Sequence, residues 1–268
     1  MSGFQNKIRQ IAKDTDKYLH QYFKKRDAKS YLLKPMKYGL FSGGKRFRSK
    51  IIVDTGKIFN IDYNLLKALS AAVECVHSYS LIHDDLPCMD DDDIRRGKLS
   101  THKKFGESTA ILSGNSLLTL AFEILSDKKL KLKNKIKTEL IHSLGICSGH
   151  SGMAGGQYLD LNFEHKKVNK LQLIEMQNKK TGKLFSFCCS SSAIIKEKKL
   201  WPKKIILMSL DNVGSKKGPN ISKYKKIKSN SIVAPMVASA YALRKFIQCA
   251  SIQKNNFLVI NLLLSKMV

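Results

Sequence analysis

Hydrophobic side chains recur at intervals of three and four residues along much of the chain, which is the periodicity of amphipathic helices. The segments 64–85, 108–127 and 169–195 show this spacing most clearly, and the N-terminal twenty residues mix both charge signs at helical spacing. In the first segment the apolar stripe consists of Leu65, Leu69, Ala72, Val73 and Val76. Two-residue alternation bounded by turn dipeptides, which is typical of sheets, is scarce. The pattern predicts an all-α protein, with too many long apolar helices for a simple four-helix coiled bundle.

The composition fits a globular protein. A chain of 268 residues, 43% of them apolar, is able to bury a substantial core. It contains no run of eighteen or more apolar residues, and its N-terminus lacks the apolar core of a signal peptide, so we expect no membrane span. The six cysteines show neither a CxxC pair nor zinc-site spacing, which predicts free thiols in a reducing compartment. We therefore expect a cytoplasmic protein.

The formal net charge of +27 admits a nucleic-acid-binding interpretation. Most of this charge comes from lysines scattered along the chain, and there is no interleaved series of aromatic residues and arginines on which bases could stack. The scattered lysines favour general compositional bias over a designed patch. We expect no nucleic acid as the primary partner.

Six aspartates fall within residues 84–93, directly after an apolar helical segment. Like charges at this density repel and raise one another's pKa, which predicts that something positive binds there. Carboxylates without histidine or thiolate neighbours suit a hard cation such as Mg²⁺. The alternative is a solvated acidic loop. An EF-hand is excluded because its glycine and glutamate are missing at the required spacings.

Helical spacing predicts how part of this acidic segment is arranged. Glu74, His77 and Asp84 share one helix face near the C-terminal end of the predicted helix. Pro87 then interrupts the intrahelical hydrogen bonds, and a bulge over residues 86–89 would return Asp90 to the side of Asp84. The geometry predicts a compact carboxylate cluster at the end of the helix.

Basic residues accompany the acidic cluster. Arg95 and Arg96 follow it directly, and the segment FSGGKRFR supplies Lys45 and Arg48 after a Gly43–Gly44 turn. Glycines let a backbone approach an anion, and arginine binds phosphate oxygens through two parallel hydrogen bonds. By itself this segment could be a loop before a solvated helix, and it is not a Walker loop. Together with the aspartates it predicts two anion sites, one bridged by metal and one held by basic side chains.

Five segments in this order resemble the motifs of the short-chain trans-polyprenyl diphosphate synthases, and most closely those of the bacterial farnesyl diphosphate synthases. They are GGKRFR, AAVECVHSYSLIHDDLPCMDDDDIRRG, KFGESTAILSGNSLL, GMAGGQYLDL and KKTGKLFSF. The resemblance extends from about residue 4 to about residue 196. It implies a single-domain helical bundle of the isoprenoid synthase type around a deep central cavity, usually as a homodimer. The implied reaction condenses isopentenyl diphosphate with dimethylallyl or geranyl diphosphate to give farnesyl diphosphate.

The resemblance also implies a role for each matching side chain. The residues that would hold Mg²⁺ against the allylic diphosphate are Asp84, Asp85 and Asp90. Those that would bind the diphosphate of isopentenyl diphosphate are Lys45, Arg48, His77 and Arg96. Those that would bind the allylic diphosphate are Arg95, Lys180 and Thr181, whereas Gln157 and Asp160 would line the cavity. Tyr79, five residues before Asp84, would limit chain length, although its simpler interpretation is a packed helix aromatic.

The last quarter of the chain departs from that resemblance. The family's second aspartate motif, of the form QDDxxD, has no counterpart, and from 198 to 268 the only acid is Asp211, against fourteen lysines and arginines. We therefore predict a catalytic bundle over 1–197 and a divergent or degenerate basic region over 198–268. This region is a frame-shifted or decayed remnant, a genuine divergent ending, or part of a non-catalytic partner subunit. The alternative to an enzyme is a catalytically impaired homologue that keeps the fold.

Overall fold

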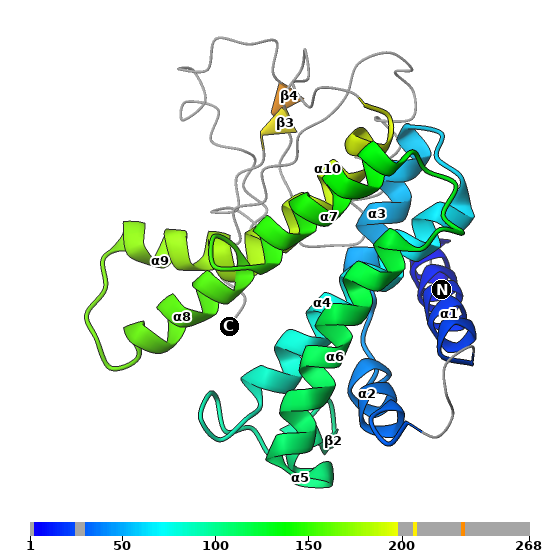
Figure 1. The fold of residues 1–268 in the computed structure, drawn as a ribbon. Coiled ribbons are helices and arrows are strands. Elements are labelled where there is room, and N and C mark those ends of the chain that lie inside the picture. The colour runs from blue at the N-terminus through cyan, green and yellow to red at the C-terminus, as the bar shows by residue number, and fades with distance from the viewer. Residues whose placement is uncertain (1–2, 25–29, 198–205, 208–231, 234–268) are drawn as a thin grey trace. The chain divides into compact units, whose positions relative to one another are not determined.

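The computed structural model describes residues 3–24, 30–197, 206–207 and 232–233 of the chain (Figure 1). The chain divides into two compact units, Met1–His142 and Ser143–Val268, which we call the N-terminal and C-terminal units. Helix α7 (Asn134–Ser148) contains the boundary between them. Each unit is described by itself.

The N-terminal unit is built around one long helix. Its helices before α7 are α1 (Gly3–Lys24), α2 (Leu33–Leu40), α3 (Phe47–Ile58), α4 (Tyr63–Asp84), α5 (Thr101–Phe105) and α6 (Glu107–Ser126). A short antiparallel hairpin, β1 (Ile94–Arg95) with β2 (Lys98–Leu99), lies between α4 and α5. Helix α4 contacts α1, α2, α3 and α6, and Figure 1 shows it running beside α6.

Helix α4 occupies this central place because it is apolar on nearly every side. Every residue from Ala68 to Val76 is buried, which is typical of a helix surrounded by other elements. The helix begins at a defined cap, since the Asp62 side chain accepts hydrogen bonds from the backbone amides of Asn64 (2.9 Å) and Leu65 (3.2 Å). These bonds satisfy amides that the first turn leaves without partners.

Helices α4 and α6 are long and apolar enough to cross a membrane, judged by length and composition. Within the tested windows, 67% of α4 and 44% of α6 is buried inside the protein. Core helices of globular proteins pass the same test, so these two helices do not establish a membrane span.

The C-terminal unit contains α8 (Met153–Phe163), α9 (Lys170–Gln177), the π-helical turn η1 (Asn178–Gly182) and α10 (Lys183–Ile195). The predicted helix over 169–195 is therefore present, but it widens by one π turn in its middle. Gly156 of α8 faces this turn, and a Cβ there would overlap the backbone of Lys179 and Lys180. The two strands described after residue 197, β3 (Ile206–Leu207) and β4 (Ile232–Val233), pair in parallel.

The described structure confirms the predicted all-α class, with two-residue strands as the only sheet elements in the described ranges. The cysteines whose surroundings are described are all free thiols, as predicted: Cys75, Cys88, Cys147, Cys188 and Cys189. Cys249 lies outside the described residues, as does the basic region 198–268 apart from β3 and β4. The predicted boundary near residue 197 therefore stays a prediction.

A buried guanidinium group connects the helices of the N-terminal unit. Arg46 precedes α3 in the left-handed region (φ 48°) and is 6% exposed. Its Nη1 donates to Glu74 Oε2 of α4 (3.2 Å), its Nη2 to the Leu40 carbonyl of α2 (2.7 Å), and its Nε to Asp16 Oδ1 of α1 (3.1 Å). Glu74 Oε1 also accepts from the backbone amide (3.2 Å) and hydroxyl (2.7 Å) of Ser49. Four helix segments thus meet at one charged network.

Replacement of Glu74 by Ala would leave the buried Arg46 charge short of a carboxylate. Loss of one partner from a buried ion pair costs about 3–5 kcal/mol, and we expect the free energy of unfolding measured by urea titration to fall by that amount. The matched control is Glu175→Ala, because Glu175 pairs with Lys179 on an exposed helix surface at 2.8 Å. Exposed pairs contribute about 0–1 kcal/mol, so equal losses in both variants would contradict a structural role for the network.

Candidate active site

The C-terminal end of α4 brings the backbones of two predicted metal-binding residues together, whereas the side-chain oxygens of Asp84, Asp85 and Asp90 do not all lie within 4.8 Å of one another in the described structure. After Asp84 the chain turns through Leu86, and the backbone amide of Asp90 returns to donate to the Asp84 carbonyl at 2.9 Å. Asp84 is half-buried and Asp90 is exposed. The turn therefore presents two carboxylate-bearing residues side by side, and their all-oxygen chemistry fits a hard divalent cation.

Asp85, the third predicted metal ligand, is engaged differently. It is buried, and its Oδ1 accepts hydrogen bonds from Arg95, one of them from Nε at 2.7 Å. Arg95 also donates to Asp92 Oδ2 at 2.9 Å. Burial raises the pKa of Asp85, and the hydrogen bond from Arg95 opposes that rise. The same hydrogen bond raises the pKa of Arg95. Asp85 thus positions Arg95 with one oxygen, which leaves Oδ2 as its other possible ligand atom.

Several arginines of the N-terminal unit act electrostatically on His77. Burial lowers the pKa of the His77 imidazole well below its usual value, and the charges of Arg48, Arg96, Arg46 and Arg95 lower it further. The imidazole is therefore neutral at physiological pH. Arg46 is already paired with the buried Glu74 and the half-buried Asp16, and Arg95 with Asp85 and Asp92. Guanidinium groups concentrated near one another in this way favour binding of an anion.

Gly44 determines where Arg96 lies. Gly44 has a φ of 119°, which L side chains rarely adopt, and a Cβ there would collide with the Arg96 guanidinium. The Arg96 Nη1 donates to the Gly43 carbonyl, 53 residues earlier in the chain. The glycine turn thus brings the Lys45–Arg48 segment together with the arginines that follow the aspartates. Lys45 is exposed beside this contact and Arg48 is half-buried.

Tyr79 lies on α4 above the aspartates and packs edge to face against His83, with 5.5 Å between ring centroids. His83 Nε2 lies 3.1 Å from the Ile111 carbonyl of α6, and Gly114 of α6 leaves room for that imidazole. Burial, followed by the charge of Asp84, raises the pKa of Tyr79, so its phenol stays protonated. The half-buried Tyr79 ring therefore packs on a histidine that itself contacts α6, a turn and a half before Asp84.

The remaining predicted residues belong to the C-terminal unit. Lys180 of η1 forms an ion pair with Asp160 of α8, and Thr181 follows it within the same π turn. Single π turns are often found at functional sites. Gln157 of α8 has buried Nε2 and Oε1 atoms that lack a hydrogen-bond partner among the described residues. Buried amides are rarely left unpaired, so Gln157 marks a polar surface suited to a ligand or to water.

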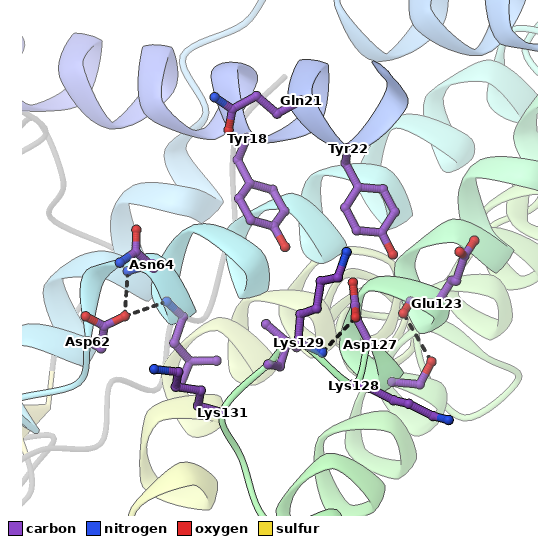
Figure 2. A pocket seen from close by; sticks show the side chains of 13 residues that line it. Tyr18, Gln21, Tyr22, Asp62, Asn64, Glu123, Asp127, Lys128, Lys129 and Lys131 are labelled. Carbon is purple, nitrogen blue, oxygen red and sulfur yellow. Dashed lines mark hydrogen bonds between the residues drawn. The ribbon is translucent and has the colours of Figure 1, made fainter. Parts of the chain in front are cut away.

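A pocket of about 880 Å³ in the N-terminal unit lies away from these residues (Figure 2). It is lined by α1, the start of α4, the end of α6 and the loop that follows α6. Figure 2 shows the hydroxyls of Tyr18 and Tyr22 pointing toward the loop of Asp127 and Lys129. This pocket and Asp84 lie at opposite ends of α4, roughly 30 Å apart for a helix of this length. None of the sequence-predicted site residues lines it.

Arg46 and Asp92 also belong to this site, although the sequence pattern did not predict them. Arg46 lies within GGKRFR, but its carboxylate partners are 28 and 30 residues away and no local pattern identifies them. The role of Asp92 could have been predicted from the sequence, since Asp92 precedes Arg95 by only three residues and carries the opposite charge.

Comparison with known proteins places the chain in a family. The Polyprenyl synthetase family model matches residues 29–215, and the chain belongs to this family. Among relatives, it is 51% identical over 146 residues to farnesyl diphosphate synthase of Buchnera aphidicola (subsp. Acyrthosiphon pisum), covering 54% of this chain and 52% of that protein. It is 49% identical over 154 residues to farnesyl diphosphate synthase of Escherichia coli, covering 57% and 52%. The chain thus spans about half the length of these curated relatives.

Solved structures agree with the family assignment. An FPP/GFPP synthase from Zymomonas mobilis, in its apo form, matches with a TM-score of 0.70 and 40% identity over 74% of this chain and 72% of that one. A geranyltransferase from Legionella pneumophila matches with a TM-score of 0.69 and 37% identity over 72% and 68%. These matches confirm the predicted isoprenoid synthase fold.

Proposed function

We propose that this chain is a prenyltransferase that condenses isopentenyl diphosphate with dimethylallyl or geranyl diphosphate to form farnesyl diphosphate. The observation that carries the proposal is that Arg96 lies against the Gly43–Gly44 turn that leads into Lys45 and Arg48, while the turn after α4 returns Asp90 to Asp84. Two diphosphates and a divalent cation would balance these charges. The names of the relatives, farnesyl diphosphate synthase and geranyltransferase, support the same reaction.

We assign the two diphosphates to different basic groups. Lys45, Arg48, His77 and Arg96 would bind isopentenyl diphosphate, because Arg96 donates to the Gly43 carbonyl and so lies against the segment that carries Lys45 and Arg48. Arg95, already aligned by Asp85, would bind the allylic diphosphate. In the C-terminal unit, Lys180 and Thr181 would also bind the allylic diphosphate, with Lys180 released from Asp160.

The chemistry follows from these assignments. The allylic C–O bond breaks, which leaves an allylic cation and a pyrophosphate that carries extra negative charge. Arg95 and Lys180 would stabilise that departing charge electrostatically. The double bond of isopentenyl diphosphate then attacks the cation, a C–C bond forms, and the departing pyrophosphate takes up the proton that is lost. Apolar walls would keep water from quenching the cation. Gln157 and Asp160 would be polar side chains within the same lining.

Asp84 and Asp90, together with the free oxygen of Asp85, would hold Mg²⁺. When bound, Mg²⁺ would neutralise charge on the allylic diphosphate and act as a Lewis acid. The homodimer and the cytoplasmic location expected for this family stay predictions. Exposed Ile111 (41%) and Leu112 (52%) on α6 offer apolar surface for a second copy.

The direct test is incubation of the whole chain with Mg²⁺, radiolabelled isopentenyl diphosphate and geranyl diphosphate, followed by chromatography of the dephosphorylated alcohols. We expect farnesol, and we expect Asp84→Ala or Asp90→Ala to reduce turnover about a hundredfold or more at saturating Mg²⁺. Glu139→Ala, an exposed acid on α7, is the control and keeps full turnover. If calorimetry shows both diphosphates binding to the unaltered chain but no product forms, the chain is a non-catalytic homologue. Near-normal turnover of Asp84→Ala would refute the metal assignment.

Separate anion sites predict separate kinetic effects. Arg48→Ala is expected to raise the KM for isopentenyl diphosphate about tenfold or more, with much less effect on geranyl diphosphate, because a lost charge-assisted hydrogen bond costs about 1.5–3 kcal/mol. Arg95→Ala is expected to affect geranyl diphosphate more. Lys98→Ala in the exposed hairpin is the control, and steady-state kinetics with each substrate varied in turn makes the measurement. Equal effects on both substrates in both arginine variants would argue for a single shared site.

Tyr79 is proposed to limit the length of the product. Its ring packs against His83, whose imidazole lies 3.1 Å from the Ile111 carbonyl of α6, so a growing hydrocarbon running along α4 would meet a side chain that is costly to displace. Tyr79→Ala should therefore shift the radiolabelled products beyond fifteen carbons. Tyr31→Ala, at a 97% exposed tyrosine, should leave the distribution unchanged. An unaltered distribution in Tyr79→Ala would place the limit elsewhere.

A further inference from the structure

A cluster of side chains of the types that ligate metals follows the first aspartates and takes no part in the proposed reaction. One oxygen from each of Asp91 and Asp93 and one ring nitrogen of His102 all lie within 4.8 Å of one another. His102 is 5% exposed, whereas both aspartates are exposed. This is the one such group of three or more histidine, cysteine or acidic side chains in the described part of the chain.

The β1–β2 hairpin builds this cluster. Its register pairs Ile94 with Leu99 and Arg95 with Lys98. One step further out, the Ser100 amide donates to the Asp93 carbonyl at 2.8 Å. Helix α5 starts at Thr101, immediately after this hydrogen bond, and carries His102 in its first turn. The three side chains are thus brought together by backbone hydrogen bonds rather than by flexible side chains alone.

The His102 ring lacks a full set of partners. Its Nδ1 lies 3.0 Å from the Ser100 hydroxyl, whereas its buried Nε2 has no hydrogen-bond partner among the described residues. Buried polar atoms nearly always have a partner. Histidines that bind metals are commonly oriented by a hydrogen bond from the ring to a neighbouring oxygen. The fixed ring next to two carboxylates is therefore prepared for a cation.

We propose that Asp91, Asp93 and His102 form a binding site for a divalent transition metal, with Zn²⁺ as its ligand, distinct from the Mg²⁺ site of Asp84 and Asp90. Two carboxylate oxygens and one imidazole nitrogen suit Zn²⁺, whereas Mg²⁺ prefers oxygen alone. The three side chains leave a fourth coordination position open. Lys103 Nζ now lies 2.8 Å from Asp93 Oδ1 and supplies the positive charge that the metal would replace.

The test is calorimetric titration of the whole chain with Zn²⁺ alone. All proteins would carry Cys88→Ser, because Cys88 is an exposed thiol three residues before Asp91 that could bind Zn²⁺ itself. In this background His102→Gln is expected to bind Zn²⁺ at least tenfold more weakly, with its fold checked by circular dichroism. Loss of a metal ligand or its supporting contact typically costs about 10–100-fold in affinity.

A second variant gives an effect of opposite sign. Lys103→Ala frees Asp93 and should tighten Zn²⁺ binding severalfold, whereas Lys104→Ala, which removes a neighbouring charge that lies over the Tyr38 ring, should not. The double variant Asp84→Asn/Asp90→Asn should lose Mg²⁺-dependent turnover and keep Zn²⁺ binding, so the two metal proposals fail separately. Unchanged affinity in His102→Gln, unchanged affinity in Lys103→Ala, or loss of Zn²⁺ binding in the double variant would each overturn this proposal.

Discussion

The Arg46 guanidinium group is the contact on which the arrangement of the N-terminal unit depends. A charge buried among apolar helices is costly unless carboxylates and carbonyls surround it, and here α1, α2 and α4 each supply one of these partners. Because Arg46 directly precedes α3, the same network fixes the Gly43–Arg48 segment against α4. The segment can then meet Arg96 at Gly44, which places cationic side chains beside His77.

The mutual repulsion of the six aspartates is reduced because several of them are paired with cationic side chains. Asp85 and Asp92 are paired with Arg95, Asp93 is paired with Lys103, and Asp84 and Asp90 are joined through their backbones at the end of α4. Some of these aspartates therefore hold cationic side chains in place. This pairing explains why a segment of six aspartates is followed directly by two arginines. The two proposed metal sites are neighbours in sequence but use different aspartates.

In the C-terminal unit, the arrangement of the site residues depends on a close approach between the backbones of α8 and η1. Gly156 lets α8 touch the η1 turn, and the π turn changes the direction in which Lys180 and Thr181 leave the helix. Lys180 then reaches Asp160, which lies one helical turn after Gly156 on α8. A helix of regular α geometry over 169–195 would rotate the residues after the turn relative to those before it. The site residues of this unit therefore depend on an irregularity that hydrophobic spacing does not reveal.

The sequence by itself determined the helical class, the extents of the long helices and the residue types of the candidate site. Helix periodicity is repeated in every turn, and the aspartates and arginines of residues 84–96 are neighbours along the chain. The local sequence pattern is therefore enough to predict both the helices and the residue types of the site. Only the tertiary structure decided which of these groups are already paired. Arg46 meets Glu74 and Asp16, Asp85 turns to Arg95, and His102 joins Asp91 and Asp93 through the hairpin. These pairings depend on how helices and turns pack, because charged groups select their partners by distance in space rather than by distance along the chain.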